Sequence, residues 1–566
     1  MKLFNDVKKW FGNQQHLFYL FLFILIIPNI LLCFTEPLPW LAKVCNVLLP
    51  LGCYYGLMTL SRTSGKMFWI LFLFLFFGAF QIVLLYLFGH SIIAVDMFLN
   101  LVTTNPGEAM ELLDNLLPAI VTVVILYVPA LVLATFSIIY KRKLAVEFLQ
   151  RERKRAFTLI GISLFALIGA YLGDARYELK SDLYPLNVCY NVGLAFQRIV
   201  LTQNYQRTSK EFSFHAKSTH PADKREVYVM VVGETSRAFN WQLYGYGRET
   251  NPFLLQQSGL IAFPKVLTES NTTHKSVPML LSAITASNYD SIYHQKGIIT
   301  AFKEAGFRTA FFSNQRYNHS FIDFFGEEAD TFDFIKEDSL DGAYNPSDDE
   351  LLKLVETELA TEAKKIFIVL HTYGSHFNYR ERYASTDAFF LPDFPVDAKV
   401  KYRTNLVNAY DNSIRYTDQF LYRLIGLLEK QHIDAAMLYT SDHGEDIYDD
   451  SRHLFLHASP IPSYYQLHVP FLLWMSKEYK VTYPEIWNEA IQNKSKGVSS
   501  SSSFFPTMLE LGGVSTRYGD HSLSVINSSY KMRKRVYLND HNESRPFTDL
   551  GMGKQDFQML KQKVGY

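Results

Sequence analysis

The sequence is poor in cysteine, and its few cysteines are unevenly placed. Three of the four, Cys33, Cys45 and Cys53, lie in an apolar first part of the chain, and only Cys189 lies beyond it. The part that follows the apolar region therefore cannot form a disulfide within itself. This absence does not assign a compartment, because a large domain is stable without disulfides even under oxidising conditions.

An excess of charge of either sign is also absent. Lys plus Arg number 55, and so do Asp plus Glu, across 566 residues. Composition therefore gives no indication of a nucleic-acid-binding surface, and we expect no nucleic-acid partner. The hydrophobic fraction of 48% averages two unlike parts, because nearly all long apolar runs lie before about position 172.

Apolar runs in the first part are long enough to span a bilayer as helices. They cover residues 16–34, 39–60, 67–88, 117–140 and 156–172. Buried core helices are the alternative, but the run 67–88 is apolar on every side and offers no polar face to water. The first run is too long for a removed signal peptide and lacks a small-residue cleavage site. We therefore predict a transmembrane domain of five helices.

Positive charge in the short connecting segments predicts the orientation of these helices. Lys and Arg occur before the first run, between the second and third, and in the segment 141–155, whereas the segment 89–116 has neither. The amino terminus is then cytoplasmic and, after an odd number of spans, everything beyond residue 172 lies outside. A solvated helix or a nucleic-acid patch is the alternative for 141–155, but its place between two spans favours the topological interpretation.

Residues 177–207 carry apolar side chains at near-helical spacing. They predict either a helix on the membrane surface or a core helix of the next domain, because periodicity alone does not separate the two. The predicted organisation is a transmembrane domain over 1–175, a bridging membrane-surface helix and linker over 176–224, and a soluble domain over 225–566.

The soluble part alternates β-rich runs with helical stretches. The predicted strands cover 227–234, 307–314, 365–376, 435–445 and 469–476, and a helical stretch at 297–306 precedes the second of them. This alternation predicts an α/β domain with a mostly parallel central sheet and helices on both faces. Ser347, followed by three acids, predicts a helix start.

Metal-binding side chains follow two of the predicted strands. Glu234 ends the first run, and Asp442 with His443 follows residues 435–441. In open α/β sheets ligands bind beyond the carboxyl ends of the strands, and two carboxylates with an imidazole suit zinc. Each fragment alone is weak evidence, because a strand-terminal Glu is often a helix cap and Asp-His-Gly can form a turn. Their joint placement predicts a zinc site.

Several motifs, in this order, resemble those of the bacterial phosphoethanolamine transferases, which include lipid A modifying enzymes. They are VVGETSRAFNWQLYGYGRETNPFL, SNTTHKSVPMLLS, LHTYGSHFNYRERY, YTSDHGEDI and LHASP. The resemblance runs from about residue 16 to about residue 512. It implies a periplasmic catalytic domain of the alkaline-phosphatase and sulfatase kind, carried by five helices in the bacterial inner membrane. By this resemblance the zinc ligands are Glu234, Thr273, Asp442 and His443, and His376 and His457 lie beside the transferred phosphate group.

Two adjacent threonines compete for the role of nucleophile. In the family pattern the nucleophile lies five residues before the Pro of the Ser-Val-Pro segment, so counting back from Pro278 gives Thr273, with Thr272 as the fallback. The alternative interpretation is a glycosylation sequon at Asn271. Metal coordination favours the alkoxide of a hydroxyl and neutralises phosphate charge, so attack on a phosphodiester would form a phospho-threonine intermediate.

His376 and His457 are candidates for proton transfer to the departing alcohol and from the acceptor. Each could instead be a phosphate-binding donor or a loop histidine with satisfied hydrogen bonds. Glu445 follows His443 by two positions and could orient that ligand, or be a surface acid.

The sequence departs from the family pattern at two places. Several lipid A modifying relatives have a disulfide that brackets the nucleophile segment, whereas this chain has Glu269 and Met279 there, so we expect rigidity to come from packing. Where those relatives contact phosphoethanolamine, the counterparts are Asn314, Gln315 and His319, of which Asn314 is the predicted substrate contact.

The predicted function is zinc-dependent transfer of phosphoethanolamine from phosphatidylethanolamine to lipid A or another envelope glycan such as the core sugars. Alternatives in the same superfamily are a phosphoglycerol transferase and a phosphodiesterase that uses water as acceptor. A non-catalytic membrane scaffold is the alternative of another class, but a scaffold has no physical need for Glu234, Thr273, Asp442 and His443 together.

Overall fold

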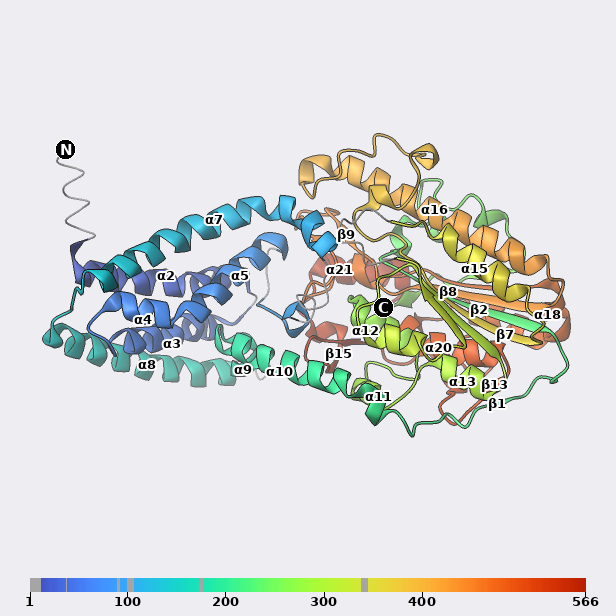
Figure 1. Ribbon diagram of the computed structural model, residues 1–566, viewed down its shortest axis with the longest axis horizontal. Coiled ribbons are helices and arrows are strands. Elements are labelled where there is room, and N and C mark those ends of the chain that lie inside the picture. Colours follow the sequence, from blue (N-terminus) through green and yellow to red (C-terminus); the bar gives the residue numbers. More distant parts are fainter. Residues whose placement is uncertain (1–11, 37, 89–91, 99–105, 174–176, 337–344) are drawn as a thin grey trace. The chain divides into compact units, whose positions relative to one another are not determined.

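The computed structural model describes residues 12–566 except 37, 89–91, 99–105, 174–176 and 337–344 (Figure 1). The chain divides into two compact units, Met1–Gln197 and Arg198–Tyr566. The boundary falls inside one helix of the segment that the sequence assigns to a bridge. The three-part division at residues 175 and 224 stays a prediction.

The regular elements in the described part of the first unit are helices. Its helices are α2 (Gln14–Thr35), α3 (Trp40–Met58), α4 (Ser64–Ile70), α5 (Phe72–Phe88), α7 (Pro106–Ile139), α8 (Val146–Gly173), α9 (Leu179–Asp182) and α10 (Leu186–Gln203), the last of which crosses the boundary. Within the described residues, 4 helices are long and apolar enough to cross a membrane, or up to 5 if the bent pair of α4 and α5 is one span. The predicted membrane domain is confirmed in this form.

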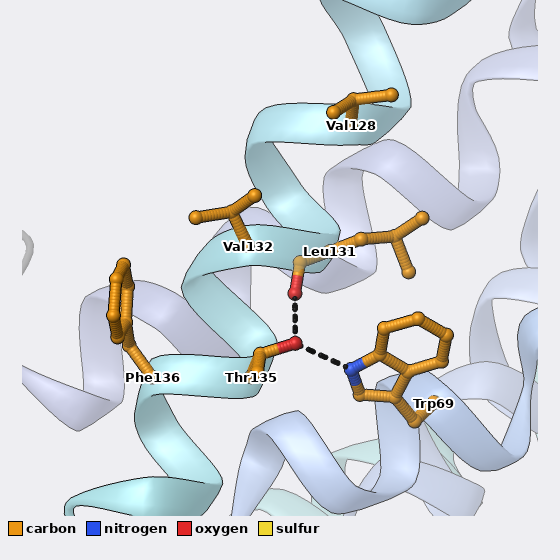
Figure 2. Close-up of a pocket in the computed structure, with 6 residues that line it drawn as sticks. All are labelled: Trp69, Val128, Leu131, Val132, Thr135 and Phe136. Atoms are coloured by element: carbon orange, nitrogen blue, oxygen red, sulfur yellow. Dashed lines mark hydrogen bonds between the residues drawn. The ribbon is translucent and has the colours of Figure 1, made fainter.

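The third predicted span is not one straight helix. Helices α4 and α5 meet at Leu71 and are bent by 62°. Neither Pro nor Gly, the usual causes of a kink, occurs there, so the sequence gives no sign of the bend. Just before it, Trp69 Nε1 donates to Thr135 Oγ1 at 3.1 Å, and that hydroxyl donates to Leu131 O at 2.8 Å (Figure 2). This chain of hydrogen bonds ties α4 to α7.

An apolar groove lies beside this contact. Its volume is about 280 Å³, and it is lined by Trp69, Val128, Leu131, Val132, Thr135 and Phe136 (Figure 2). Several of these side chains are exposed, as expected for helices that meet lipid rather than water.

The basic segment 141–155 is only partly a loop, because α8 begins at Val146. Glu152 is buried in this helix and accepts hydrogen bonds from Arg151 Nε at 2.8 Å, Arg155 Nη1 at 3.1 Å and Tyr55 Oη at 2.7 Å. These hydrogen bonds compensate the burial of the Glu152 carboxylate. Helix α8 can therefore extend through residues that the sequence predicts as part of a charged loop.

The predicted helix over 177–207 is confirmed as α9, α10 and α11 (Tyr205–Thr208). Helix α10 is amphipathic in its burial, since Val188 is fully buried whereas Phe196 is 68% exposed. Its placement on a membrane surface stays a prediction.

The second unit is built around a seven-stranded sheet (Figure 1). In spatial order the strands are β3 (Leu260–Ala262), β11 (Phe471–Met475), β8 (Asp434–Ser441), β2 (Glu226–Gly233), β7 (Lys365–His371), β5 (Arg308–Ser313) and β6 (Thr331–Phe334). Neighbours from β8 to β6 pair in parallel, whereas β11 is antiparallel to both β8 and β3. The mostly parallel sheet is confirmed, with β11, from the predicted run 469–476, as the exception.

Helices cover both faces of this sheet because its central strands are apolar on both sides. All residues of β2 are buried, with Val227, Val229 and Val231 packed on one side and Tyr228 and Met230 on the other. Burying such a side chain contributes roughly 1.5–3 kcal/mol. The first side packs against α15 (Asp349–Leu359) and α16 (Arg403–Glu429), and the second against α12 (Thr273–Leu280), α13 (Ile298–Glu304), α14 (Phe321–Gly326) and α20 (Ser500–Leu511).

Shorter elements complete the second unit. The paired strands are β1 (Lys217–Ser218) with β13 (Val514–Ser515), β4 (Val266–Leu267) with β12 (Val498–Ser499), β9 (Asp446–Ile447) with β10 (Phe455–Leu456), and β14 (Val536–Leu538) with β15 (Ser544–Pro546). The remaining α-helices of the described part are α17 (Tyr464–Leu467), α18 (Lys477–Thr482), α19 (Pro484–Asn493) and α21 (Lys554–Met559).

Candidate metal centre and active site

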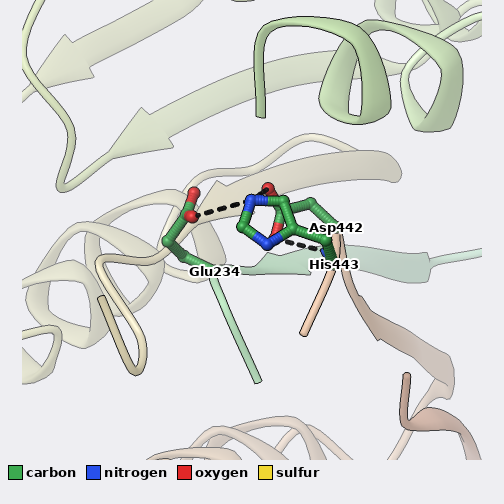
Figure 3. A group of neighbouring side chains, drawn as sticks. All are labelled: Glu234, Asp442 and His443. Atoms are coloured by element: carbon green, nitrogen blue, oxygen red, sulfur yellow. Dashed lines mark hydrogen bonds and ion pairs between the residues drawn. The ribbon is translucent and has the colours of Figure 1, made fainter. Parts of the chain in front are cut away.

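Two neighbouring parallel strands bring the predicted metal ligands together. Gly233 and Ser441 are paired at the ends of β2 and β8, so the residues that follow them, Glu234 and Asp442, leave the same edge of the sheet side by side. Glu234, Asp442 and His443 each offer one ligand atom, and these atoms lie within 4.8 Å of one another (Figure 3). The fold therefore brings together the three side chains that the sequence predicts as neighbours.

The turn after β2 is strained in a way that aims its side chains at this cluster. Thr235 has φ of 60°, which is rare for a β-branched residue. Its hydroxyl donates to Glu234 Oε1 at 2.7 Å, its backbone N–H donates to Asp442 Oδ1 at 3.0 Å, and its carbonyl accepts from Tyr410 Oη at 2.8 Å. These three contacts stabilise the left-handed backbone conformation of Thr235, which is unfavourable for a β-branched residue by itself.

The structure distinguishes the two adjacent threonines. Thr273 is the first residue of α12, and its Oγ1 lies 3.2 Å from Glu234 Oε1 and 3.1 Å from His443 Nε2. Thr272 precedes the helix, and its Oγ1 lies 3.1 Å from Ser270 Oγ. Thr273 therefore meets the carboxylate and imidazole of the cluster, and Thr272 contacts a neighbouring loop hydroxyl.

The donor atoms of the cluster fit a divalent cation. Glu234 and Asp442 are at most 1% exposed, and Glu234 Oε2 and Asp442 Oδ2 have no hydrogen-bond partner within the described part of the chain. Burial, and then the neighbouring Asp442, raises the pKa of Glu234 well above its usual value; burial raises the pKa of Asp442 to about 6. Burial lowers the pKa of His443, so its imidazole is neutral and able to ligate. The two buried carboxyls can be ionised together beside a neutral imidazole only if a positive charge is present, which a divalent metal ion would supply.

His457 lies beside His443 of this cluster, and His376 lies beside His457. The ring centroid of His457 lies 4.2 Å from that of His443 and 5.9 Å from that of His376. His376 Nδ1 donates to Phe377 O at 2.6 Å, which leaves its Nε2 as the other ring position, and burial lowers the pKa of the imidazole. Both predicted histidines therefore lie next to the candidate metal site.

Glu445 contacts a different histidine from the one expected. Its Oε1 lies 3.4 Å from His457 Nδ1, whereas His443 Nδ1 lies 3.0 Å from Gly444 O. Both expectations for Glu445, a support for His443 and a surface acid, are wrong, because the residue is fully buried and its carboxylate lies against His457. Glu445 is instead placed to fix the ring of His457.

The loop that carries His376 is held by an acid whose role the sequence did not reveal. Asp348 accepts hydrogen bonds from Tyr373 N at 2.8 Å and from Gly374 N at 3.1 Å. Gly374 has φ of +53°, and a Cβ there would lie 2.7 Å from Glu234 O, so only glycine lets the loop cross the strand end. Ser347 was expected to cap α15, but Asp348 is the residue before the helix, and its side chain makes no capping bond.

Asn314 contacts Asp348 and so also helps to hold the loop of His376. Its Nδ2 donates to Asp348 Oδ1 at 2.8 Å and to Pro346 O at 3.0 Å, while its buried Oδ1 has no partner within the described residues. Gln315 Nε2 donates to Thr372 O at 3.0 Å. These amides hold the loop of His376, and a direct substrate contact of Asn314 stays a prediction.

Arg237 is a further residue that supports the site and that the sequence did not reveal. Its buried guanidinium binds both carboxylate oxygens of Asp449, at 2.6 and 3.0 Å, and donates to Glu445 O at 2.8 Å. The same group packs over the rings of Tyr410 and Tyr465. A bidentate buried pair of this kind fixes the segment that follows His443; only its position inside the first motif could have drawn attention to it.

The segment around Thr273, the predicted nucleophile, is held by hydrogen bonds as well as by packing. Met279 is fully buried in the core, as expected. Glu269 is 4% exposed, and its carboxylate accepts from Ser502 Oγ at 2.6 Å and from Ala286 N at 3.1 Å. It thereby joins the segment before Thr273 to the first turn of α20 and to a separate turn.

Comparisons with known proteins agree with this architecture. The family model described as Sulfatase matches residues 226–514. Phosphoethanolamine transferase EptA of Salmonella typhimurium is 31% identical over 306 residues, which are 52% of this chain and 55% of that protein. Phosphoethanolamine transferase EptC of Escherichia coli K12 is 26% identical over 331 residues, 56% of each protein. The matched part thus spans about half the length of these curated relatives.

Solved structures are similar over larger parts. The C-terminal periplasmic domain of EptC from Escherichia coli, solved in complex with Zn, has a TM-score of 0.54 and 25% identity, and covers 60% of this chain and 97% of that one. The integral membrane lipooligosaccharide phosphoethanolamine transferase A of Neisseria meningitidis has a TM-score of 0.69 and 22% identity, and covers 90% of this chain and 97% of that one. The latter likeness extends the common fold to the helical unit.

Proposed function

This chain belongs to the sulfatase family, and from that premise we propose that it is a zinc-dependent phosphoethanolamine transferase. It moves phosphoethanolamine from phosphatidylethanolamine to lipid A or another envelope glycan through a phospho-threonine intermediate. The observation that carries the proposal is the position of Thr273 Oγ1, which lies 3.2 Å from Glu234 Oε1 and 3.1 Å from His443 Nε2. A hydroxyl on buried metal-ligand atoms has the surroundings of an activated nucleophile.

The metal would be held by Glu234, Thr273, Asp442 and His443. When bound there, zinc supplies positive charge that favours the alkoxide of a hydroxyl and offsets the charge of a phosphate. The similar EptC domain, which was solved in complex with Zn, supports the choice of metal.

The first half-reaction would be carried by Thr273 and His457. Thr273 Oγ1, already deprotonated to its alkoxide, forms a bond to the donor phosphorus, and the bond from phosphorus to the diacylglycerol oxygen breaks. His457 gives a proton to that departing oxygen, with Glu445 holding its ring at 3.4 Å. His376 gives its Nδ1–H to Phe377 O, so its Nε2 can donate to a phosphoryl oxygen only once the ring takes up a second proton beside that anionic group.

In the second half-reaction the bond from phosphorus to Thr273 breaks. His457, now without its proton, accepts one from the acceptor group, which then forms the new bond to phosphorus. The same ring thus acts as acid and as base, and the enzyme returns to its starting state.

The proposed location is the bacterial inner membrane, with residues beyond the last span in the periplasm. The candidate spans and the charge distribution of their connecting segments support this topology. There the catalytic unit would meet both its lipid donor and a glycolipid acceptor. The names of the curated relatives support the transferred group, and the resemblance of the motifs to those of lipid A modifying enzymes supports the acceptor class.

The test is product analysis with the full chain in proteoliposomes. Phosphatidylethanolamine labelled in its headgroup is supplied with and without lipid A, and products are identified by mass spectrometry. We expect label on lipid A with the parent protein and none with Thr273→Ala. Label released as free phosphoethanolamine despite acceptor would indicate a phosphodiesterase, turnover only with phosphatidylglycerol would indicate a phosphoglycerol transferase, and no turnover with any donor would contradict an enzyme.

A further inference from the structure

The second unit displays large apolar side chains on one short segment, residues 389–403. Phe389 is 51% exposed, Leu391 68%, Phe394 70% and Val400 45%. Single exposed apolar residues are normal on a soluble domain, but contiguous groups of this kind mark surfaces that bind an apolar partner.

The exposure is fixed by the fold. Asn405, Asn408 and Asn412 follow one another at helical spacing on α16 and so share one face of it. Each binds the backbone of the segment: Asn405 donates to Pro395 O at 3.2 Å, Asn408 donates to Pro392 O at 2.8 Å, and Asn412 Oδ1 accepts from Phe389 N at 3.0 Å and Phe390 N at 2.8 Å. The backbone is therefore fastened to the helix while the apolar side chains are left outside.

The acid at the centre of the segment is turned inward. Asp393 is buried and binds Tyr383 Oη at 2.7 Å and Arg380 Nε at 2.9 Å. Its charge is thus neutralised inside the unit and does not oppose an apolar or anionic partner.

Basic residues lie in the same segment and against its first ring. Lys399, Lys401 and Arg403 are exposed, with Arg403 Nε donating to Tyr448 O at 2.7 Å, and the guanidinium of Arg415 lies 4.1 Å from the ring centroid of Phe389. The other acid of the segment, Asp397, lies 3.9 Å from Lys399. Apolar and basic side chains on one segment fit the boundary between acyl chains and phosphate groups, which is anionic in most bacterial membranes.

We propose that residues 389–403 form a lipid-surface contact. Phe389, Leu391, Phe394 and Val400 enter the headgroup region of a bilayer, and Lys399, Lys401 and Arg403 meet lipid phosphates. A bilayer is the chosen partner because the membrane helices of the chain keep the second unit tethered to one, which gives lipid the highest local concentration of any apolar partner. The proposal needs those helices and does not depend on the transferase activity.

The first test reads the surroundings of one side chain. Full-length Phe394→Cys is labelled with an environment-sensitive dye in nanodiscs of phosphatidylethanolamine and phosphatidylglycerol, with Val481→Cys, at a 74% exposed apolar position in α18, as the matched control. The signal of the parent protein, whose Cys53 and Cys189 are exposed, is subtracted. We expect blue-shifted emission and at least twofold stronger quenching by spin-labelled lipid at position 394 than at 481.

Two outcomes would overturn the proposal. Water-like emission at both positions would place the segment in solvent. Blue-shifted emission at 394 without quenching by spin-labelled lipid would mean that a protein surface covers the segment.

The second test addresses the charges. Lys399→Gln combined with Lys401→Gln should reduce lipid quenching at position 394 when the discs contain phosphatidylglycerol and leave it unchanged in discs of zwitterionic lipid. Both side chains are exposed, so an unchanged thermal midpoint serves as the folding control. Equal quenching of the variant and its parent in anionic discs would contradict the assignment of these residues to lipid phosphates.

Discussion

Thr272 and Thr273 offer a matched pair of substitutions whose expected effects differ by orders of magnitude. Thr272→Ala removes one contact between neutral hydroxyls, that with Ser270 Oγ at 3.1 Å. Such a hydrogen bond contributes about 1 kcal/mol. Even if the whole amount were lost from the transition state, the rate would fall by less than about tenfold. Thr273→Ala removes the proposed nucleophile, and we expect a fall of at least about 10³-fold.

The assay separates the covalent step from overall transfer. The protein is incubated with donor lipid alone and digested, and the peptide that contains both threonines is examined by mass spectrometry for added phosphoethanolamine. We expect the adduct in the parent, in Thr272→Ala and in Thr273→Ser, and none in Thr273→Ala. Metal content and thermal midpoint are measured for each variant, because loss of either would explain inactivity without a role in chemistry.

The result that would refute this reasoning is specific. If Thr272→Ala abolished the adduct while Thr273→Ala kept it, the nucleophile would be displaced by one residue despite the contact of Thr273 with Glu234 and His443. If neither substitution mattered, a threonine mechanism would fail.

Three further predictions concern polar groups of the second unit. His457→Gln should lower the transfer rate by roughly 10²–10⁴-fold with metal content retained; full activity, or inactivity with metal loss, would remove it from the proton-transfer step. Glu269→Leu should lower the free energy of unfolding by about 2–4 kcal/mol, because it leaves Ser502 Oγ and Ala286 N buried without an acceptor. Glu269→Gln keeps an acceptor oxygen and should retain most of the stability measured by chemical denaturation. An equal loss in both variants would contradict the hydrogen-bond explanation. Burial lowers the pKa of His468 to about 4, whereas the unfolded chain has a pKa of about 6.5 there. As the pH falls from 6.5 to 4 the unfolded chain binds a proton that the folded chain does not, so the free energy of unfolding decreases by about 3 kcal/mol. His468→Gln should make the thermal midpoint less dependent on pH over this range, and an unchanged pH dependence would contradict the role of His468.

The grouping of the candidate metal ligands could be predicted because it depends on features that a sequence displays. Apolar runs mark β2 and β8, and the carboxyl ends of parallel strands meet at one edge of a sheet, so Glu234 and Asp442 were expected to converge. The direction of β11 could not be predicted in this way. Its run 469–476 is as apolar as its neighbours, and apolarity does not encode whether a strand runs parallel or antiparallel.

The supporting residues were harder to find because their partners are distant in the sequence. Asp348 stands before α15 and has the local pattern of a helix start, yet its carboxylate binds backbone N–H groups of the 373–374 turn. Glu445 is two residues from His443 but contacts His457. In both cases tertiary contacts override the local pattern, and only coordinates reveal which buried donor an acid satisfies.

The residues that hold the site in place share one feature, which is a buried charged group held by hydrogen bonds. All cysteines precede Arg198, so the second unit holds the proposed nucleophile and the candidate metal ligands without a disulfide. Buried charged groups take that place: Arg237 pairs with Asp449 after the metal-ligand motif, and Glu269 joins Ser502 and Ala286 before Thr273. A buried charge is costly unless several directed hydrogen bonds satisfy it, and such bonds tolerate little displacement. The directed hydrogen bonds that these buried charged groups need therefore also fix the geometry of the site. They do so independently of the redox conditions around the protein.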